Sequence, residues 1–175
     1  MIYVSNQYDS LVANSASTSE KTLVNTIEIY VDADACPVKD EIFRVAGRHS
    51  LKIHVVSNSW MRLENNPLIN QVVVAEGPDV ADDWIADHIT GNDIAITADI
   101  PLADRCVKQG ACVIGSTGKP FTEESIGMAL AMRDLMTQLR ETGEITGGPS
   151  GFTKQDRSRF LSTLEETIQS IKRRL

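Results

Sequence analysis

Residues 27–37 read Ile-Glu-Ile-Tyr-Val-Asp-Ala-Asp-Ala-Cys-Pro. The β-branched and aromatic side chains of Ile27–Val31 predict a buried strand, which ends at Asp32 and Asp34. Pro37 suits the first position of a helix, where its missing N–H is not needed. A strand that leads through a short turn directly into a helix is the basic unit of a parallel α/β sheet.

The same alternation continues along the chain. Because strands alternate with helices, we expect a three-layer α/β sandwich around a mainly parallel five-stranded sheet, with the strand order 3-2-1-4-5. The first and fourth strands are then neighbours at the topological switch point, where ligands bind beyond the carboxyl ends of the strands. The other strands are expected at 52–56, 71–75, 93–98 and 111–114, and the helices at 37–48, 79–89, 102–109, 122–140 and 160–172.

The 175 residues suit one domain with an extension at each end. Residues 1–26 are rich in Ser, Asn and Thr without a period, which predicts a loose extension. The α/β domain is expected over 27–143. Residues 144–175 are expected to form a linker around Gly147–Gly151 and a C-terminal helix docked on the domain.

Composition predicts a soluble cytoplasmic protein. The chain is 42% hydrophobic, and it has no apolar run near the ~18 residues of a membrane span and no convincing signal peptide. Three cysteines fit free thiols in a reducing cytosol. The formal net charge is −7, which argues against a large duplex-binding surface. A basic C-terminal region is a candidate contact for a nucleic-acid backbone, or simply the solvated edge of a docked helix: Lys154, Arg157, Arg159, Lys172, Arg173 and Arg174.

Aspartates gather at the edge where the strands end. Asp32 and Asp34 finish the first strand and Asp99 finishes the fourth, so the sheet order brings them together. The helix after the third strand adds Asp79, Asp82 and Asp83, which can share one face. Helix capping explains Asp79 or Asp82 equally well, but it does not explain the convergence of strand ends. Such an all-oxygen site suits one or two Mg²⁺ or Mn²⁺ ions, which could activate water and stabilise a phosphoryl transition state.

Three motifs carry a resemblance: Val31-Asp-Ala-Asp-Ala-Cys-Pro37, Gly77-Pro-Asp-Val-Ala-Asp-Asp-Trp-Ile85 and Thr97-Ala-Asp-Ile-Pro-Leu-Ala103. Together with Gly143-Glu-Ile-Thr-Gly-Gly-Pro149, they resemble the YaiI/YqxD family of uncharacterised bacterial proteins. The domain of that family is similar to PIN-like (including NYN-type) metal-dependent ribonucleases. The resemblance implies that Asp32, Asp79 or Asp83, and Asp99 bind metal, with Asp32, Asp83 and Asp99 as the catalytic set. It adds Asp34 as a further ligand, and Asp82 and Asp104 as supporting acids.

Further residues are weaker candidates for binding a phosphate-containing substrate. Lys39 either orients a phosphate or is a solvated helix lysine. Trp60, near Arg62, either stacks on a base or packs on the domain as a lid. Ser116, Thr117 and Lys119 form a loop after the fifth strand that is not a Walker motif, because Val113 and Pro120 break the pattern.

Two other features are expected to belong to the core. Cys36 is expected to pack rather than act as a nucleophile, because no histidine lies near it in sequence and nearby carboxylates disfavour the thiolate. Met128, Met132 and Met136 are expected on the core face of the long helix, together with Leu135.

Three functions fit these features. The first is a Mg²⁺- or Mn²⁺-dependent phosphodiesterase that acts on RNA or on a small phosphate-containing ligand. The second is a metal- or nucleotide-binding regulatory module without turnover. The third, a haloacid-dehalogenase-type phosphatase, is disfavoured because residues 63–98 contain no Lys or Arg to serve its chemistry. The sequence leaves the oligomeric state open.

Overall fold

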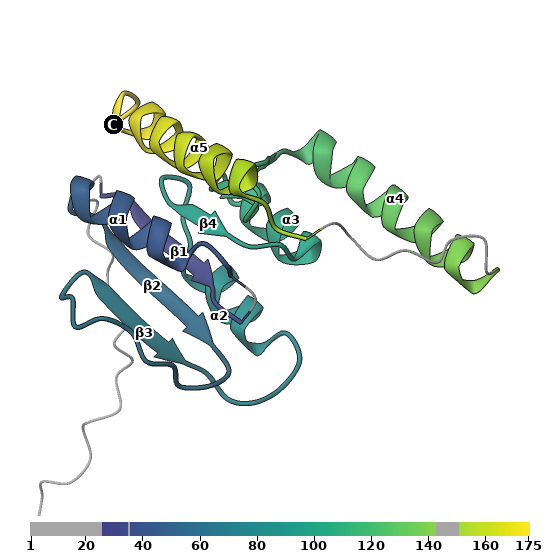
Figure 1. The fold of residues 1–175 in the computed structure, drawn as a ribbon, viewed down its shortest axis with the longest axis horizontal. Coiled ribbons are helices and arrows are strands. Elements are labelled where there is room, and N and C mark those ends of the chain that lie inside the picture. The colour runs from purple at the N-terminus through teal and green to yellow at the C-terminus, as the bar shows by residue number, and fades with distance from the viewer. Residues whose placement is uncertain (1–25, 35, 143–150) are drawn as a thin grey trace, which may run out of the picture.

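The computed structural model describes residues 26–34, 36–142 and 151–175. Its sheet has the order β3-β2-β1-β4-β5-β6, and the first five strands of that order are parallel (Figure 1). The expected α/β fold and strand order are therefore confirmed. The elements are β1 (Glu28–Asp32), α1 (Lys39–His49), β2 (Lys52–Ser57), β3 (Ile69–Val73), α2 (Val80–His88), β4 (Ile94–Ile96), α3 (Ile100–Lys108), β5 (Cys112–Ile114), β6 (Pro120–Phe121), α4 (Glu123–Glu141) and α5 (Lys154–Lys172).

The sheet has one strand more than expected. The two residues of β6 pair antiparallel with β5 at the edge of the sheet. A turn in which the Gly115 N–H donates to the Lys119 carbonyl returns the chain to that edge. Pro120 is compatible with an edge strand because it does not need to donate to a further neighbour. A strand this short leaves no periodic pattern in the sequence.

Each face of the sheet is covered by helices, because side chains alternate along each strand. Ile29 and Val31 of β1 point to the face covered by α1 and α5, and Tyr30 points to the face covered by α2 and α3. Figure 1 shows α1 and α5 side by side over the first face. The result is the expected three-layer arrangement, with a separate apolar core on each side of the sheet.

Helix α5 begins at Lys154, six residues before the expected start. The Thr153 hydroxyl accepts from the Asp156 N–H, and the Asp156 carboxylate accepts from the Thr153 N–H, which makes a capping box. The polar first turn hides this start from a search for apolar periodicity. The buried stripe of α5 consists of Phe160, Leu164, Ile168 and Ile171.

Helix α4 differs from the expectation in its orientation. Met128, Met132 and Leu135 were expected inward, but all three side chains are exposed. Only Ile126 of this helix is fully buried, and the helix projects away from the sheet (Figure 1). The expectation placed Met128, Met132 and Leu135 on the core face, but they lie on the side of the helix opposite to Ile126 and meet solvent.

The extension predicted for residues 1–26 lies outside the described residues except for Thr26, and the linker predicted around Gly147–Gly151 lies outside them except for Gly151. None of the described helices combines the length and the apolar character that a membrane span requires.

Candidate functional site

The candidate site lies where β1 and β4 end side by side. Val31 is paired with Ile96 in the register, so the next residues, Asp32 and Thr97, face each other across the two strands. The buried Thr97 hydroxyl donates a hydrogen bond of 2.9 Å to Asp32 Oδ2. The hydroxyl oxygen of Thr97 in turn accepts a hydrogen bond of 3.0 Å from the Asp99 N–H. One hydroxyl group therefore ties the two strand-end aspartates together.

Asp99 also caps helix α3. Its Oδ1 accepts from the Leu102 N–H at 2.8 Å, and Pro101 occupies the first turn of the helix. Capping is a sufficient structural reason for an aspartate at this position. Within the described residues, however, no hydrogen bond is made to the other carboxylate oxygen of Asp99. Asp99 can therefore cap the helix and still offer one oxygen to a ligand.

The environment of Asp32 disfavours its negative charge. Burial raises the pKa of the Asp32 carboxyl, and the charges of Asp34 and Asp99 raise it further. Hydrogen bonds from the Thr97 hydroxyl and from the Asp34 backbone N–H act in the opposite direction. Asp34 itself is exposed. A cation at this edge would relieve the repulsion that these carboxylates exert on one another.

Helix α2 adds Asp82 to the same cluster. Burial raises the pKa of Asp82 from 3.8 to about 6, and the charges of Asp99, Asp32 and Asp79 contribute in that order. Arg105 lowers it in part. Asp82 is therefore a residue of α2 whose charge the strand-end aspartates disfavour.

The other candidate acids are placed differently. Asp83 is exposed and makes an ion pair of 2.7 Å with Arg105. Asp104 pairs with Lys108 at 2.6 Å and is not among the charges that shift the pKa of Asp32 or Asp82. The structure therefore favours Asp82 over Asp83 as the contribution of this helix.

Asp79 occupies a strained position at the start of α2. It is the N-cap of the helix, with a φ of 61°, and its side chain makes no capping hydrogen bond. A non-glycine residue in this left-handed region is uncommon, although aspartate tolerates it better than most. Capping therefore does not account for the Asp79 side chain, which stays available beside Asp82.

The acids do not form a finished coordination sphere. Within residues 26–34, 36–142 and 151–175, no group of three or more His, Cys, Asp or Glu side chains is arranged so that it could hold a metal ion. The cluster is therefore defined by mutual electrostatic influence and shared hydrogen bonds rather than by ligand geometry.

Two of the predicted substrate-binding residues have clear positions. Lys39, in the first turn of α1, donates from Nζ to the Ala33 carbonyl at 3.0 Å, so its charge lies directly beside the end of β1. Trp60 is 72% exposed, which excludes the packed lid. Arg62 is also exposed on the segment after β2.

The loop of Ser116, Thr117 and Lys119 supports α5. The Thr117 carbonyl accepts from Arg159, and the Gly118 carbonyl accepts from the Thr163 hydroxyl at 2.9 Å. Gly118 has a φ of +80°, and a Cβ there would come within 2.5 Å of the Phe160 nitrogen. The loop therefore has a packing role that explains its glycine without a phosphate.

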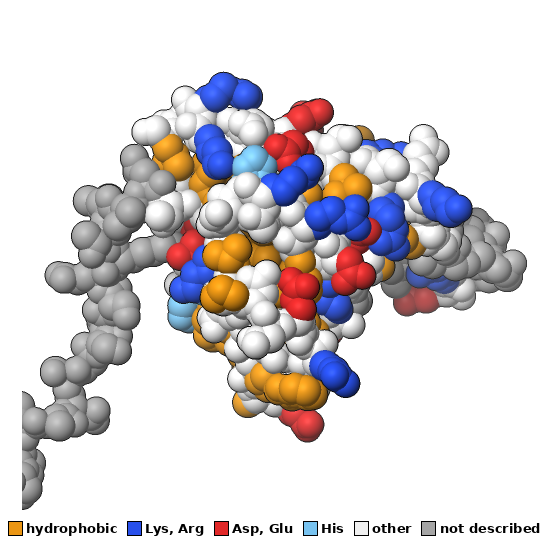
Figure 2. Space-filling model, turned by 60° about the vertical axis from the view of Figure 1, so that its left-hand side comes forward, with side chains coloured by type: hydrophobic (Ala, Val, Ile, Leu, Met, Phe, Trp, Pro, Cys, Tyr) orange, Lys and Arg blue, Asp and Glu red, His pale blue; other side chains and the backbone are white. Residues whose placement is uncertain are grey.

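Many of the basic residues in α5 are engaged with the rest of the protein. Arg157 forms an ion pair with Glu41, whose side chain is 4% exposed, and lies over the Phe152 ring. Arg159 pairs with Asp156, and Lys172 contacts His49. Figure 2 shows acidic and basic side chains interleaved on the face drawn, without one large positive patch. These contacts favour the interpretation of α5 as a docked helix with a mixed, solvated edge.

Cys36 is part of the core. Its side chain packs with the buried residues under α1, and burial raises the pKa of its thiol. A buried thiol with a raised pKa is a poor nucleophile. The structure agrees with the packing role expected for this residue.

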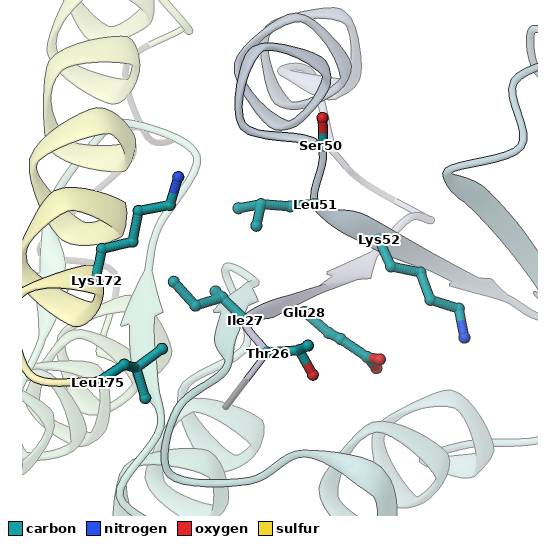
Figure 3. A pocket seen from close by; sticks show the side chains of 8 residues that line it. All are labelled: Thr26, Ile27, Glu28, Ser50, Leu51, Lys52, Lys172 and Leu175. Carbon is teal, nitrogen blue, oxygen red and sulfur yellow. The ribbon is translucent and has the colours of Figure 1, made fainter. Parts of the chain in front are cut away.

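A cavity of about 430 Å³ lies at the other end of the strands, where β1 and β2 begin (Figure 3). Ile27, Leu51 and Leu175 form its apolar part, and Lys172 reaches towards it from the end of α5. None of its lining residues belongs to the carboxylate cluster. The cavity is therefore separate from the candidate site.

Comparison with known proteins gives one consistent result. The profile of the uncharacterised YaiI/YqxD family matches residues 30–170. A UPF0178 protein of Parvibaculum lavamentivorans is 63% identical over 147 residues, which cover 84% of this chain and 97% of the relative. A UPF0178 protein of Rhodospirillum rubrum is 60% identical over 148 residues, covering 84% of this chain and 99% of the relative. No solved structure matches the chain significantly.

Proposed function

We propose that this chain, which belongs to the YaiI/YqxD family, is a Mg²⁺- or Mn²⁺-dependent phosphodiesterase acting on RNA. The description of the family assigns no activity, so the support comes from the site of this chain. The observation that carries the proposal is the linked pair of Asp32 and Asp99, which are joined through Thr97 and whose charges raise the pKa of Asp82. This cluster lies at the switch point of a parallel sheet, the usual place of ligands in such folds.

The raised pKa values of Asp32 and Asp82 support a cation as the missing partner. Structural aspartates are normally paired with a base or hydrogen-bonded so that their charge is favoured. Here burial and mutual repulsion disfavour the charge, and Arg105 offsets only part of the effect on Asp82. Perturbed groups of this kind are enriched at functional sites.

The donor chemistry of the site fits a hard divalent cation. Asp32, Asp82 and Asp99 offer carboxylate oxygens, and Asp34 and Asp79 lie next to them as further donors. Mg²⁺ commonly keeps several waters and uses one or two protein carboxylates, so the lack of a ready three-ligand group among the described residues is compatible with it. When bound, such an ion activates water and neutralises charge on a phosphoryl group. Asp82 replaces Asp83 in this proposal because Asp83 is paired with Arg105.

A single-stranded or short substrate fits the surrounding charges better than a long duplex does. Lys39 is hydrogen-bonded to the carbonyl of Ala33, the residue after Asp32, and the exposed Trp60 can stack on an unpaired base. The chain carries a net charge of −7, so it cannot neutralise many phosphates at once. RNA is proposed over DNA on the resemblance to PIN-like ribonucleases.

The test uses the full chain with short single-stranded RNA, matched DNA and bis(4-nitrophenyl) phosphate, each with Mg²⁺, Mn²⁺ or EDTA. We expect hydrolysis with either metal, none in EDTA, and a loss of at least about a thousandfold in Asp99→Asn. Asparagine keeps the helix cap, so this variant separates chemistry from folding. Asp104→Asn is the matched control and should retain activity. Full activity in EDTA or in Asp99→Asn would refute the proposal.

The regulatory module remains the second candidate, and one observation favours it. The carboxylates are close enough to perturb one another, yet among the described residues they are not preassembled as ligands. If Mn²⁺ raises the melting temperature while none of the three substrates is cleaved, the metal-binding module without turnover is the better description.

A further inference from the structure

Helix α4 has two apolar faces, and the described residues cover one of them. Ile126 is buried and Leu130 packs with it against α3. On the opposite side of the helix, Met128, Met132 and Leu135 are 69%, 53% and 47% exposed. Leu139, which is partly buried, continues the same line. Exposed large apolar side chains are common singly, but a row of them on one helix face marks an interaction surface.

The spacing of this row is that of a coiled-coil seam. Met128, Met132, Leu135 and Leu139 follow one another at intervals of four, three and four residues, which corresponds to d, a, d and a positions. We call these four residues the α4 seam. The positions that flank the seam carry no charge: Ala129, Ala131, Met136 and Gln138.

The charges of this stretch all lie away from the seam. Arg133, Asp134, Arg140 and Glu141 occupy the outward positions of the same repeat. A partner of strong opposite charge would therefore find no complementary group along the seam. An interface core depleted of charge and rich in Met is typical of association with another apolar helix.

We propose that the partner is a second copy of this chain, and that two α4 helices pair antiparallel about a two-fold axis passing between Arg133 and Asp134. In this arrangement Met128 meets Leu139 of the other copy, and Met132 meets Leu135. The small Ala129 lies opposite the large Met136. Because a two-fold interface must be complementary to itself, this agreement between the two halves of one helix is the argument for self-association.

The expected dimer is weak. The seam spans about 17 Å of helix at 1.5 Å per residue, so it buries less than the roughly 1,600 Å² of a standard interface. Helix α4 also projects from the sheet, so a second copy can approach the seam without displacing any of the described elements (Figure 1). We expect a dissociation constant of about 1–100 μM.

Sedimentation velocity on the full chain between about 1 and 300 μM tests the association. The wild type should pass from a 19.2 kDa monomer to a species of twice that mass. Met132→Glu should raise the dissociation constant at least about a hundredfold, because its carboxylate would be buried without a partner. Thr137→Glu, on the opposite side of α4, should leave it unchanged. A wild type that is monomeric throughout, or a Met132→Glu dimer as tight as the wild type, would overturn the proposal.

Disulfide trapping tests the direction of pairing. Met128→Cys and Leu139→Cys are made separately in a Cys112→Ser background, where the remaining Cys36 and Cys106 are buried. Antiparallel pairing brings these positions together only when the two proteins are mixed, so oxidation should give a cross-linked heterodimer. Efficient self-linking of either protein alone would indicate parallel helices and overturn the proposed symmetry. Neither measurement depends on catalysis, so both stand whether or not the proposed hydrolysis is found.

Discussion

The Thr97 hydroxyl and the Asp32 carboxylate are hydrogen-bonded at 2.9 Å, although 65 residues separate them in the chain. The bond crosses from the end of β4 to the end of β1. The hydroxyl oxygen of Thr97 also accepts a hydrogen bond from the Asp99 N–H. Thr97 therefore sets the relative position of the two aspartates to which the proposed function gives the leading role. Because it acts through these two aspartates, Thr97 is a positioning residue.

Thr97→Val is expected to separate this role from simple packing. The substitution keeps the shape of the side chain but removes the hydroxyl that donates to Asp32 and leaves the Asp99 N–H without its acceptor. The free energy of unfolding should fall by about 1–3 kcal/mol. The Mn²⁺-induced rise in melting temperature should shrink as well, and any turnover should fall in kcat more than in KM. Thr97→Ser keeps the hydroxyl and should restore all three quantities. A valine variant that responds to Mn²⁺ like the wild type would show that Thr97 only packs.

Asp32→Asn is expected to act in opposite directions on the apo and the metal-loaded protein. Without metal, the substitution removes a partly buried charge that is repelled by Asp34 and Asp99, so the melting temperature at pH 7.5 should rise. The further rise given by millimolar Mn²⁺, which follows RT ln(1 + [L]/Kd), should become smaller. Thermal melts in EDTA and in Mn²⁺ measure both effects, with Asp104→Asn as the control. A wild type whose melting temperature ignores Mn²⁺ would argue against any metal at this edge.

The pKa of Asp82 predicts how stability depends on pH. The folded protein holds this proton up to a pKa of about 6, compared with an ordinary value of 3.8. The group therefore favours the folded state at acidic pH, and this contribution is lost as the pH rises from about 4 through 6. Asp82→Asn should stabilise the apo protein at pH 7.5 and have less effect at pH 4. Urea unfolding at the two pH values gives the comparison, and an equal effect at both would contradict the assignment.

Asp83→Asn is the matched control for Asp82 because the two residues are adjacent in α2. Asp83 is exposed and paired with Arg105, so its loss should change stability by no more than about 1 kcal/mol, with the opposite sign to Asp82→Asn at pH 7.5. If Asp83→Asn rather than Asp82→Asn abolished the response to Mn²⁺, the original choice of Asp83 from the family resemblance would be the better one.

The Glu41–Arg157 pair predicts a test of how α5 is held. The Glu41 side chain is 4% exposed, and its Oε2 has no hydrogen-bond partner in the described part of the chain. Arg157→Ala would leave this carboxylate buried and unpaired, which should lower the free energy of unfolding by about 2–4 kcal/mol. Adding Glu41→Gln should recover part of the loss. Urea unfolding of the single and double variants, with Arg173→Ala as a control, measures the loss of free energy of unfolding and its recovery. An additive double variant would show that the two residues act independently.

The strand order of the sheet, and the meeting of aspartates where the strands end, could be predicted because strands and helices alternate along the sequence. Once strands and helices alternate, right-handed crossovers limit the strand order, and that order brings Asp32 beside Asp99. The choice between Asp82 and Asp83 could not be made in the same way. Adjacent helical residues point about 100° apart, and only the packing of α2 on the sheet decides which one faces the strand ends.

Three other features of the structure were not predicted from the sequence: the role of Thr97, the exposure of the α4 seam and the start of α5. The role of Thr97 depends on a hydrogen bond across strands, which no local pattern encodes. The α4 seam has the periodicity of a buried stripe, and periodicity shows which residues share a face but not whether the chain itself supplies the cover. The start of α5 was missed although Thr153 and Asp156 carry the signature of a capping box, so this signal was present in the sequence.

Helix α5 has a consequence for the order in which the protein folds during its synthesis. Its residues Phe160, Leu164 and Ile168 complete the core that includes Ile94 and Ile114 of the sheet. A ribosome makes every described strand before it makes these residues. Of the two described helices that cover this face of the sheet, only α1 is present until translation is nearly finished. Apolar strand faces exposed in this interval are prone to aggregate. A messenger truncated between the codons of Glu141 and Phe160 should therefore yield an insoluble product, even though it still encodes all of the proposed catalytic aspartates.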